Sequence, residues 1–247
     1  IYQVGEDQNV PFIAMQFLQG ESLQQRIDRE GQLDETEVLR VGREIAQGLA
    51  AAHAQGLTHR DIKPDNIWLQ EEQGRVKIVD FGLVRDNADD AGLTQTGVIM
   101  GTPRYMAPEQ ARGEQVDHRC DLFSLGSLLY QLASGKPAFQ GNNLTATLIA
   151  VAHETPQTIN EHNPDLDPAV ATLIMRLLEK APDRRPQTAQ EVVETISQIE
   201  TEYLQPPDRP ALTAAASAAP TVMLPGSRSS KGLRRGIGGF GLTILLG

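Results

Sequence analysis

Residues 59–66 of this 247-residue chain read HRDIKPDN, and two further runs follow: DFG at 80–82 and GTPRYMAPE at 101–109. A phosphoryl-transfer site needs a carboxylate to hold the acceptor hydroxyl, a cation beside the moving phosphate and oxygen ligands for Mg²⁺. The chain supplies these groups in order: Asp61, Lys63, Asn66 and Asp80. Any one of them alone would be a surface charge in most proteins, but their joint occurrence in ordered runs predicts such a site.

Short strands and one long helix surround the first run. The apolar stretch FIAMQF at 12–17 is typical of a buried strand, and the β-branched segments 67–70 and 75–79 predict a hairpin. Residues 34–55 repeat apolar side chains at helical spacing, and Asp34 is placed to cap that helix.

The second half of the chain is helical in pattern. We expect helices at 121–134, 144–153, 168–180 and 188–203, the last opened by Thr188. A few strands followed by a run of helices predict an α+β fold.

Charge and cysteine content exclude several classes of protein. The net charge is −10, and residues 206–247 hold five basic residues against one acidic residue, so +4 there leaves −14 for residues 1–205. An acidic body argues against a nucleic-acid partner, because phosphate contacts need a basic face. The single cysteine, Cys120, excludes an internal disulfide and favours a cytosolic, reducing location.

The three runs closely resemble the eukaryotic-type serine/threonine protein kinase family, of the bacterial receptor-like, membrane-anchored kind, over residues 1 to about 204. The resemblance implies a kinase domain at 1–204 with a mostly helical C-terminal lobe (19–204) and a truncated β-rich N-terminal lobe (1–18). It also implies transfer of the γ-phosphate of ATP to serine or threonine hydroxyls of protein substrates in signal transduction, with Mg²⁺ as cofactor.

The same resemblance assigns roles to the motif residues. Asp61 is the expected catalytic base, and Lys63, in the Asp-x-Lys spacing of serine/threonine kinases, would neutralise charge on the γ-phosphate. The expected metal ligands are Asn66 and Asp80. Residues with expected structural or regulatory roles are His59, Arg60, Phe81, Gly82, Glu109, Asp121 and Arg185. Among these, Asp121 would tie down the catalytic loop and Arg185 would pair with Glu109.

Two further segments receive roles from the resemblance. Residues 11–18 would form the strand that leads into the hinge, where Met15, Gln16 and Leu18 would contact adenine. In the activation segment, Thr94 and Thr96 are expected autophosphorylation sites, reached in a kinase–kinase dimer, and Arg60 would pair with such a phosphate. Thr102 would help admit a serine or threonine substrate. The two threonines could equally be ordinary solvated loop residues.

The chain departs from the family pattern ahead of the hinge. A glycine-rich loop, a strand lysine and a helix glutamate are expected there, but the first lysine of the chain is Lys63. We therefore expect a fragment that lacks the front of the small lobe and is weak or inactive alone. A pseudokinase that acts as a binding or scaffold module is the alternative. A small-molecule phosphotransferase is disfavoured, because it would lack the run at 101–109.

The C-terminal residues have a different composition. Residues 205–235 are rich in Pro, Ala and Ser and end in the basic KGLRR, while 236–247 (GIGGFGLTILLG) are uncharged. A basic flank before an apolar segment is typical of a membrane helix with a cytoplasmic N-terminal side. We expect a juxtamembrane linker and the start of a single-pass helix near Gly236, although twelve residues are too few to span a bilayer and a mildly apolar tail remains the alternative.

Overall fold

The computed structural model describes residues 2–8, 10–71, 74–80 and 103–204. The chain divides into two units, Ile1–Pro206 and Pro207–Gly247, and the second lies outside the described residues. The predicted linker and membrane segment, 205–235 and 236–247, therefore lie outside them as well. In the described part of the chain, no helix has the length and apolarity needed to cross a membrane.

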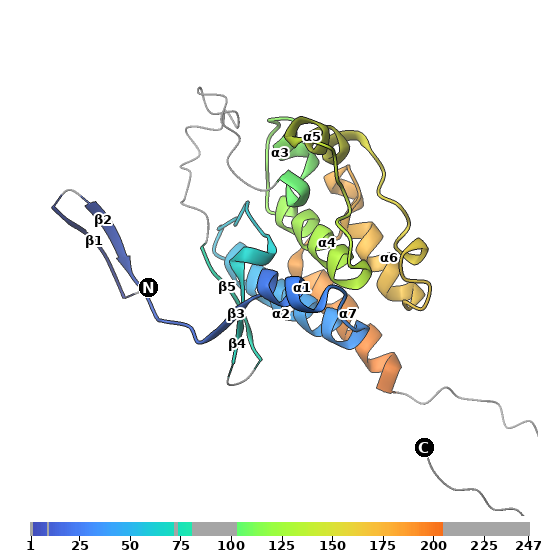
Figure 1. Cartoon of the computed structure of the whole chain (residues 1–247), viewed down its shortest axis with the longest axis horizontal. Coiled ribbons are helices and arrows are strands. Elements are labelled where there is room, and N and C mark those ends of the chain that lie inside the picture. Colours follow the sequence, from blue (N-terminus) through green and yellow to red (C-terminus); the bar gives the residue numbers. More distant parts are fainter. Residues whose placement is uncertain (1, 9, 72–73, 81–102, 205–247) are drawn as a thin grey trace, which may run out of the picture. The chain divides into compact units, whose positions relative to one another are not determined.

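Two small antiparallel sheets contain all five strands of the described residues (Figure 1). In the first sheet, β1 (Gln3–Asp7) pairs with β2 (Val10–Ala14). The second sheet has the order β3-β4-β5 and consists of β3 (Gly20–Ser22), β4 (Ile67–Gln70) and β5 (Val76–Ile78). The hairpin predicted at 67–70 and 75–79 is confirmed as β4 and β5.

The short strand β3 was not predicted, and a single glycine makes its pairing with β4 feasible. Gly20 has a φ of +128°, and a Cβ built there would lie 2.0 Å from the carbonyl oxygen of Leu69. Any side chain at this position would clash with the β4 backbone. Strand β3 therefore joins the hairpin through an approach that only glycine permits.

Two helices, α1 and α2, follow β3 in the sequence and precede the run at 59–66. Helix α1 (Leu23–Glu30) begins with a capping box between Ser22 and Gln25, which the sequence pattern did not predict. Helix α2 (Glu35–His53) was predicted, and its cap is as expected: the Asp34 side chain accepts a hydrogen bond from the Glu37 backbone.

The predicted C-terminal helices are also confirmed, with small shifts at their ends. They are α4 (Arg119–Ser134), α5 (Leu144–His153), α6 (Pro168–Leu177) and α7 (Ala189–Leu204), and a short α3 (Pro108–Ala111) precedes them. Helix α6 ends three residues before the predicted Lys180. Four short 3₁₀ turns complete the described helical segments: η1 (Pro64–Asn66), η2 (Pro103–Tyr105), η3 (Ile159–Glu161) and η4 (Pro182–Arg184).

Helix α4 forms the centre of the helical body. All its residues from Cys120 to Ser134 are buried, because α2 and α6 both pack against it. Small residues allow the close packing: a Cβ on Gly42 of α2 would lie 3.0 Å from Leu129 of α4, and one on Gly126 would lie 2.6 Å from Leu177 of α6. A helix buried on every side can position a site rigidly.

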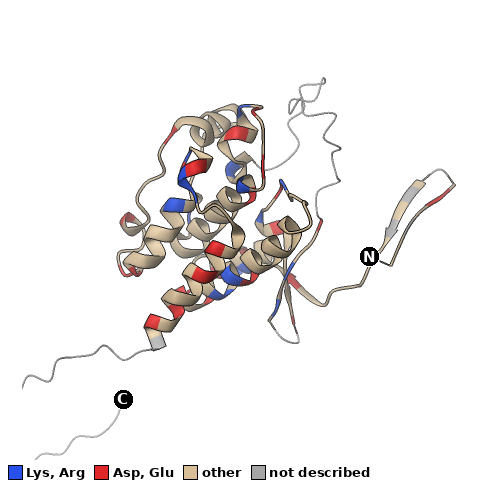
Figure 2. Ribbon diagram, turned by 180° about the vertical axis from the view of Figure 1, so that it is seen from behind, with Lys and Arg blue, Asp and Glu red and all other residues tan. Residues whose placement is uncertain are grey.

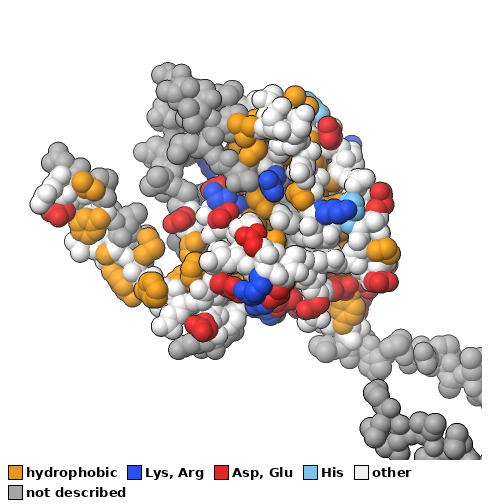
Figure 3. Space-filling view, viewed as in Figure 1, with side chains coloured by type: hydrophobic (Ala, Val, Ile, Leu, Met, Phe, Trp, Pro, Cys, Tyr) orange, Lys and Arg blue, Asp and Glu red, His pale blue; other side chains and the backbone are white. Residues whose placement is uncertain are grey.

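Charged residues cover the outside of this body. Acidic residues recur along α7 (Figure 2), and Glu200 of α7 pairs with Arg43 of α2 at 3.0 Å. Acidic and basic side chains intersperse over the face shown in Figure 3. Exposed pairs of this kind contribute little to stability, so the interior decides the fold.

One ion pair lies inside the body. Both guanidinium nitrogens of Arg185 donate to Glu109, at 2.7 and 2.8 Å, and the two side chains are 0% and 4% exposed. The remaining Arg185 hydrogens go to the backbone carbonyls of Arg119, Glu179 and Lys180. A buried charge pair is tolerated only when its polar atoms are satisfied in this way. The pair fixes the start of α3 and of α4 relative to the segment that precedes α7.

We predict that Glu109→Gln lowers the free energy of unfolding by about 3–5 kcal/mol, because it leaves the Arg185 charge buried without a counter-charge. Urea unfolding measures the change. The control is Glu114→Gln, which breaks an equally bidentate pair with Arg112, at 2.7 and 2.9 Å, on a side chain that is 52% exposed. The control should change stability by no more than about 1 kcal/mol. Equal losses in the two variants would contradict the assignment.

Candidate active site

The loop between α2 and β4 carries the first sequence motif. The chain leaves α2 at His53, turns at Gly56 with a φ of +74°, and enters β4 through η1. Proline at the first position of η1 fixes the backbone and has no N–H to satisfy. The loop is therefore held between a buried helix and a paired strand, which suits a site whose groups must not move.

Asp61, Lys63 and Asn66 meet inside this loop. The ammonium of Lys63 lies 2.6 Å from Oδ2 of Asp61. Nδ2 of Asn66 donates to the Asp61 carbonyl oxygen at 2.8 Å and to its carboxylate at 3.1 Å. Asn66 is buried, while the Asp61 side chain is 44% exposed. The carboxylate is thus held from one side and open to an incoming group on the other.

Asp80 lies two residues after the end of β5, and the intervening Val79 ties it to the same loop. The Val79 N–H donates to the Asn66 carbonyl at 2.9 Å, and the His59 ring contacts the Val79 carbonyl at 3.2 Å. Asp80 is exposed and has a φ of +52°, in the left-handed region that is uncommon for residues other than glycine. Backbone strain of this kind concentrates at functional sites.

Asp121, in the first turn of α4, holds the loop between α2 and β4 in place through its carboxylate. Its carboxylate accepts hydrogen bonds from the His59 N–H at 2.9 Å and the Arg60 N–H at 2.7 Å. Nε2 of His53 also lies 2.8 Å from it, and because a carboxylate can only accept, this nitrogen carries the hydrogen. Asp121 is 0% exposed, so these three donors compensate its loss of water.

His53 was not predicted as part of the site. A histidine near the end of a helix is typically packed there or faces the helix dipole. The structure places it in the last turn of α2, facing the buried carboxylate of Asp121. No sequence signal connects the two residues, because 68 positions separate them and their contact depends on how α2 packs on α4.

Cys120, beside Asp121, and Tyr105, which contacts α4 at Gln131, stay protonated at neutral pH. Burial, and then the charge of Asp121, raises the pKa of the Cys120 thiol well above its ordinary value. Burial also raises the pKa of Tyr105 to about 12, and its hydroxyl donates to Gln131 of α4. Neither residue is therefore a nucleophile under ordinary conditions. The Tyr105 hydroxyl joins the turn η2 to α4.

The side chains present fit a magnesium ion held jointly with a nucleotide. Mg²⁺ takes oxygen ligands and is commonly bound by one or two protein side chains plus phosphate oxygens and water. Asn66 presents Oδ1 once Nδ2 donates to Asp61, and Asp80 presents an exposed carboxylate. No cluster of three or more His, Cys, Asp or Glu that could hold a metal by itself occurs among the described residues.

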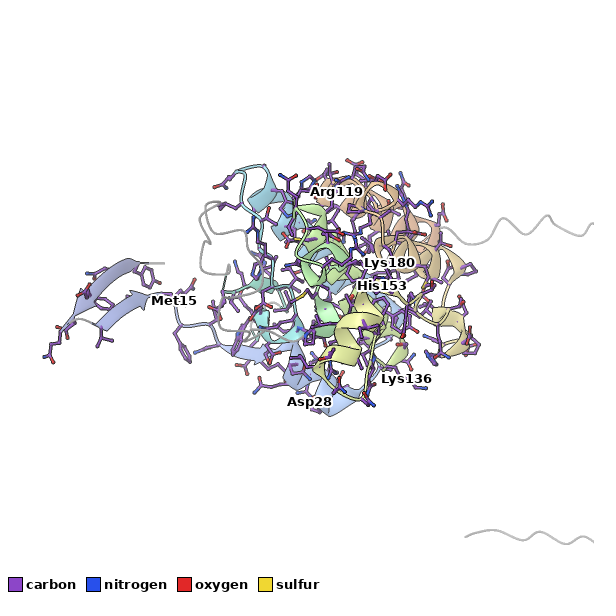
Figure 4. All side chains as sticks on the ribbon, turned by 90° about the horizontal axis from the view of Figure 1, so that it is seen from above. Met15, Asp28, Arg119, Lys136, His153 and Lys180 are labelled. Carbon is purple, nitrogen blue, oxygen red and sulfur yellow. The ribbon has the colours of Figure 1, made fainter. Side chains whose placement is uncertain are left out.

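The other expected site residues fall into two groups. Met15, Gln16 and Leu18 lie in the connection between β2 and β3, where Met15 and Gln16 are exposed and Leu18 is half-buried. Figure 4 labels Met15 in this connection. The expected residues that lie outside the described part of the chain are Phe81, Gly82, Thr94, Thr96 and Thr102.

Comparison with known proteins gives one consistent family. The family model for the protein kinase domain matches residues 1–196. The serine/threonine-protein kinase pkn3 of Myxococcus xanthus is 37% identical over 215 residues, which cover 84% of this chain and 39% of that protein. The serine/threonine-protein kinase PknB of Mycobacterium leprae is 31% identical over 246 residues, 98% of this chain and 37% of its own length. The chain thus spans well under half of these relatives.

We predict that Asp121→Asn lowers the free energy of unfolding by about 2 kcal/mol. The amide would turn a donor toward one of the backbone N–H groups that the carboxylate now accepts. Urea unfolding measures the change. Asp117→Asn serves as the control, because Asp117 also pairs with a cation, Arg119, but its own side chain is 48% exposed. The control should stay within about 1 kcal/mol of the wild type. A loss no larger than the control's would refute the anchoring role.

Proposed function

The chain belongs to the protein kinase domain family, and from this premise we propose that it transfers the γ-phosphate of ATP to serine and threonine hydroxyls of protein substrates. The observation that carries the proposal is the meeting of Asp61, Lys63 and Asn66 in one loop, with Asp80 tied to that loop through Val79. These groups are the set that phosphoryl transfer requires. The names of the relatives, which are serine/threonine kinases, support the choice of acceptor.

In this proposal Asp61 is the catalytic base. Its carboxylate accepts the proton of the acceptor hydroxyl and orients the oxygen toward the γ-phosphate. The exposed side of Asp61 receives the hydroxyl, while Lys63 and Asn66 hold the carboxylate from the other side. Positioning of this kind supplies much of the rate in a reaction that needs little covalent chemistry from the protein.

Lys63 supplies the positive charge. Its ammonium lies 2.6 Å from the Asp61 carboxylate, so it stands where the hydroxyl and the transferred phosphoryl group would meet. A fixed cation there offsets negative charge that builds up on the phosphoryl oxygens in the transition state. Asn66 and Asp80 would hold Mg²⁺, which neutralises charge on the nucleotide phosphates when bound.

The hinge and activation residues complete the proposal. The backbone of Gln16 and Leu18, with the Met15 side chain beside them, would bind adenine. Phosphorylation of Thr94 or Thr96 by a second copy of the kinase would supply a charge for Arg60 to pair with. The support for both roles is the match of the family model, which covers all of these positions.

We predict that Asp61→Asn lowers kcat of the full-length protein at least about a hundredfold, because the amide cannot accept the hydroxyl proton. The measurement is Mg²⁺-dependent transfer of labelled phosphate from ATP to serine or threonine in a generic protein substrate. Asp65→Asn is the matched control: Asp65 lies in the same loop, carries the same group and is exposed. It should retain nearly full activity. Transfer that survives Asp61→Asn would overturn the proposal.

We also propose that the C-terminal segment anchors the kinase domain to the inner face of the cytoplasmic membrane, through a single-pass helix that begins near Gly236. Lys231, Arg234 and Arg235 directly precede the apolar residues, as in membrane helices with a cytoplasmic N-terminal flank. The alignment with PknB of Mycobacterium leprae covers 98% of this chain, so it extends into this segment.

We expect the full-length protein to remain in the membrane pellet after an alkaline carbonate wash. A variant that lacks the apolar segment beginning at Gly236 should move to the supernatant. Fractionation with an antibody to the kinase domain measures this. Wild-type protein in the washed supernatant would show that the apolar segment does not insert.

A further inference from the structure

The side chain of Gln110 joins two segments that are far apart in the sequence. Its Nε2 donates to the carbonyl oxygen of Arg60 at 2.9 Å, and its Oε1 accepts from the Ala107 N–H at 3.0 Å. Arg60 lies in the catalytic loop, directly before Asp61. Ala107 lies in the run GTPRYMAPE, which by family resemblance shapes the site for a protein substrate. One amide group therefore contacts both halves of the proposed site.

Local structure fixes the orientation of this amide. Gln110 is the third residue of α3, and its oxygen satisfies the N–H of Ala107, the residue that caps that helix. An amide that accepts through Oε1 on one side must present its two N–H donors on the other. The hydrogen bond at the helix cap thus determines that the Gln110 N–H group, and not its oxygen, faces Arg60.

The Arg60 backbone needs such a restraint. Its φ is +65°, in the left-handed region, where a residue other than glycine is strained and persists only when its surroundings hold it. The Arg60 N–H is held by the buried carboxylate of Asp121 at 2.7 Å. The Arg60 carbonyl is held by Gln110, so the two polar ends of the strained residue are fastened to α4 and α3 respectively.

The hydrogen bond to the Arg60 carbonyl affects the orientation of Asp61. The peptide group between Arg60 and Asp61 comprises the carbonyl held by Gln110 and the Asp61 N–H, which reaches Nδ1 of His59 at a longer 3.3 Å. Rotation of this peptide plane would change the direction in which the Asp61 side chain leaves the backbone. The shorter bond, from Gln110, is the stronger restraint against that rotation.

We propose that Gln110 is a positioning residue, which couples the segment Pro103–Ala111 to the catalytic base by holding the peptide plane that precedes Asp61. The inference rests on the proposed kinase function for its effect on rate, while the restraint itself is a property of the fold. Gln110 touches neither reacting group and acts through Arg60 and Asp61. A protein substrate would dock on the segment Pro103–Ala111. Movement of this segment therefore changes the orientation of the Asp61 carboxylate.

Two variants separate the two bonds of the amide. Gln110→Ala removes both, whereas Gln110→Glu keeps the acceptor for Ala107 and places a carboxylate oxygen against the Arg60 carbonyl. In the full-length protein we expect each variant to lower kcat roughly ten- to hundredfold, because a small displacement of a catalytic group costs that much. The KM for ATP should stay within about twofold of wild type, since the proposed adenine contacts lie at residues 15–18, outside this loop.

The glutamate variant carries a further readout. A protonated carboxyl can donate to the Arg60 carbonyl, and an adjacent carbonyl oxygen favours that neutral form. The kcat of Gln110→Glu relative to wild type should therefore rise as the pH falls from about 8 to about 6, while the ratio for Gln110→Ala stays constant. A glutamate that only weakened the fold would show no such recovery.

Gln187→Ala is the matched control. The Gln187 amide donates to the backbone carbonyls of Pro182, Asp183 and Arg185, far along the chain from the loop, so its loss weakens the fold without releasing Arg60. It should leave kcat near wild type. A fall in kcat equal to that of Gln110→Ala, or wild-type kcat in both Gln110 variants, would overturn the inference.

Hydrogen exchange tests the restraint without any activity. Amides of residues 59–62 should exchange faster in Gln110→Ala than in wild type or Gln187→Ala. If the wild-type protein transfers no phosphate, the proposed function is wrong. The exchange rates of residues 59–62 then test by themselves whether Gln110 restrains the loop. Unchanged exchange in Gln110→Ala would refute the coupling even in an active enzyme.

Discussion

The buried carboxylate of Asp121 is the constraint on which the rest of the site depends. It lies within the most buried helix of the body and has no exposure to water, so it must find its donors inside the protein. Those donors include the consecutive backbone N–H groups of His59 and Arg60 and the ring of His53. Satisfying one charge in α4 thereby determines the path of the loop that carries Asp61.

Interior interactions, and not the charged surface, connect the motifs to one another. The loop is held by Asp121 from α4 and by Gln110 from α3, and α3 is itself fastened through Glu109 to Arg185 near the start of α7. The bond between Glu109 and Arg185 is buried and the other two are partly buried, so leaving any of them unmade would cost stability. Loss of any of these hydrogen bonds would change the orientation of the Asp61 side chain.

Sequence reasoning predicted the long helices and the β4–β5 hairpin, because hydrophobic periodicity and caps such as Asp34 are local signals. It also selected Asp61, Lys63 and Asn66, which lie within one short run and meet in the structure. It missed β3, which depends on the absence of a side chain at Gly20, and the contacts of His53 and Gln110, which arise only when separate elements pack. Long-range packing leaves no periodic trace in the sequence.

The pairing of Glu109 with Arg185 has a consequence for how the protein is made. Seventy-six residues separate the two partners, so the ribosome must complete most of the helical body before the carboxylate can be neutralised. Until then, burying Glu109 would leave an uncompensated charge in the interior. The segment that contains Glu109 should therefore stay open during synthesis until the residues up to Arg185, which precede α7, have been added.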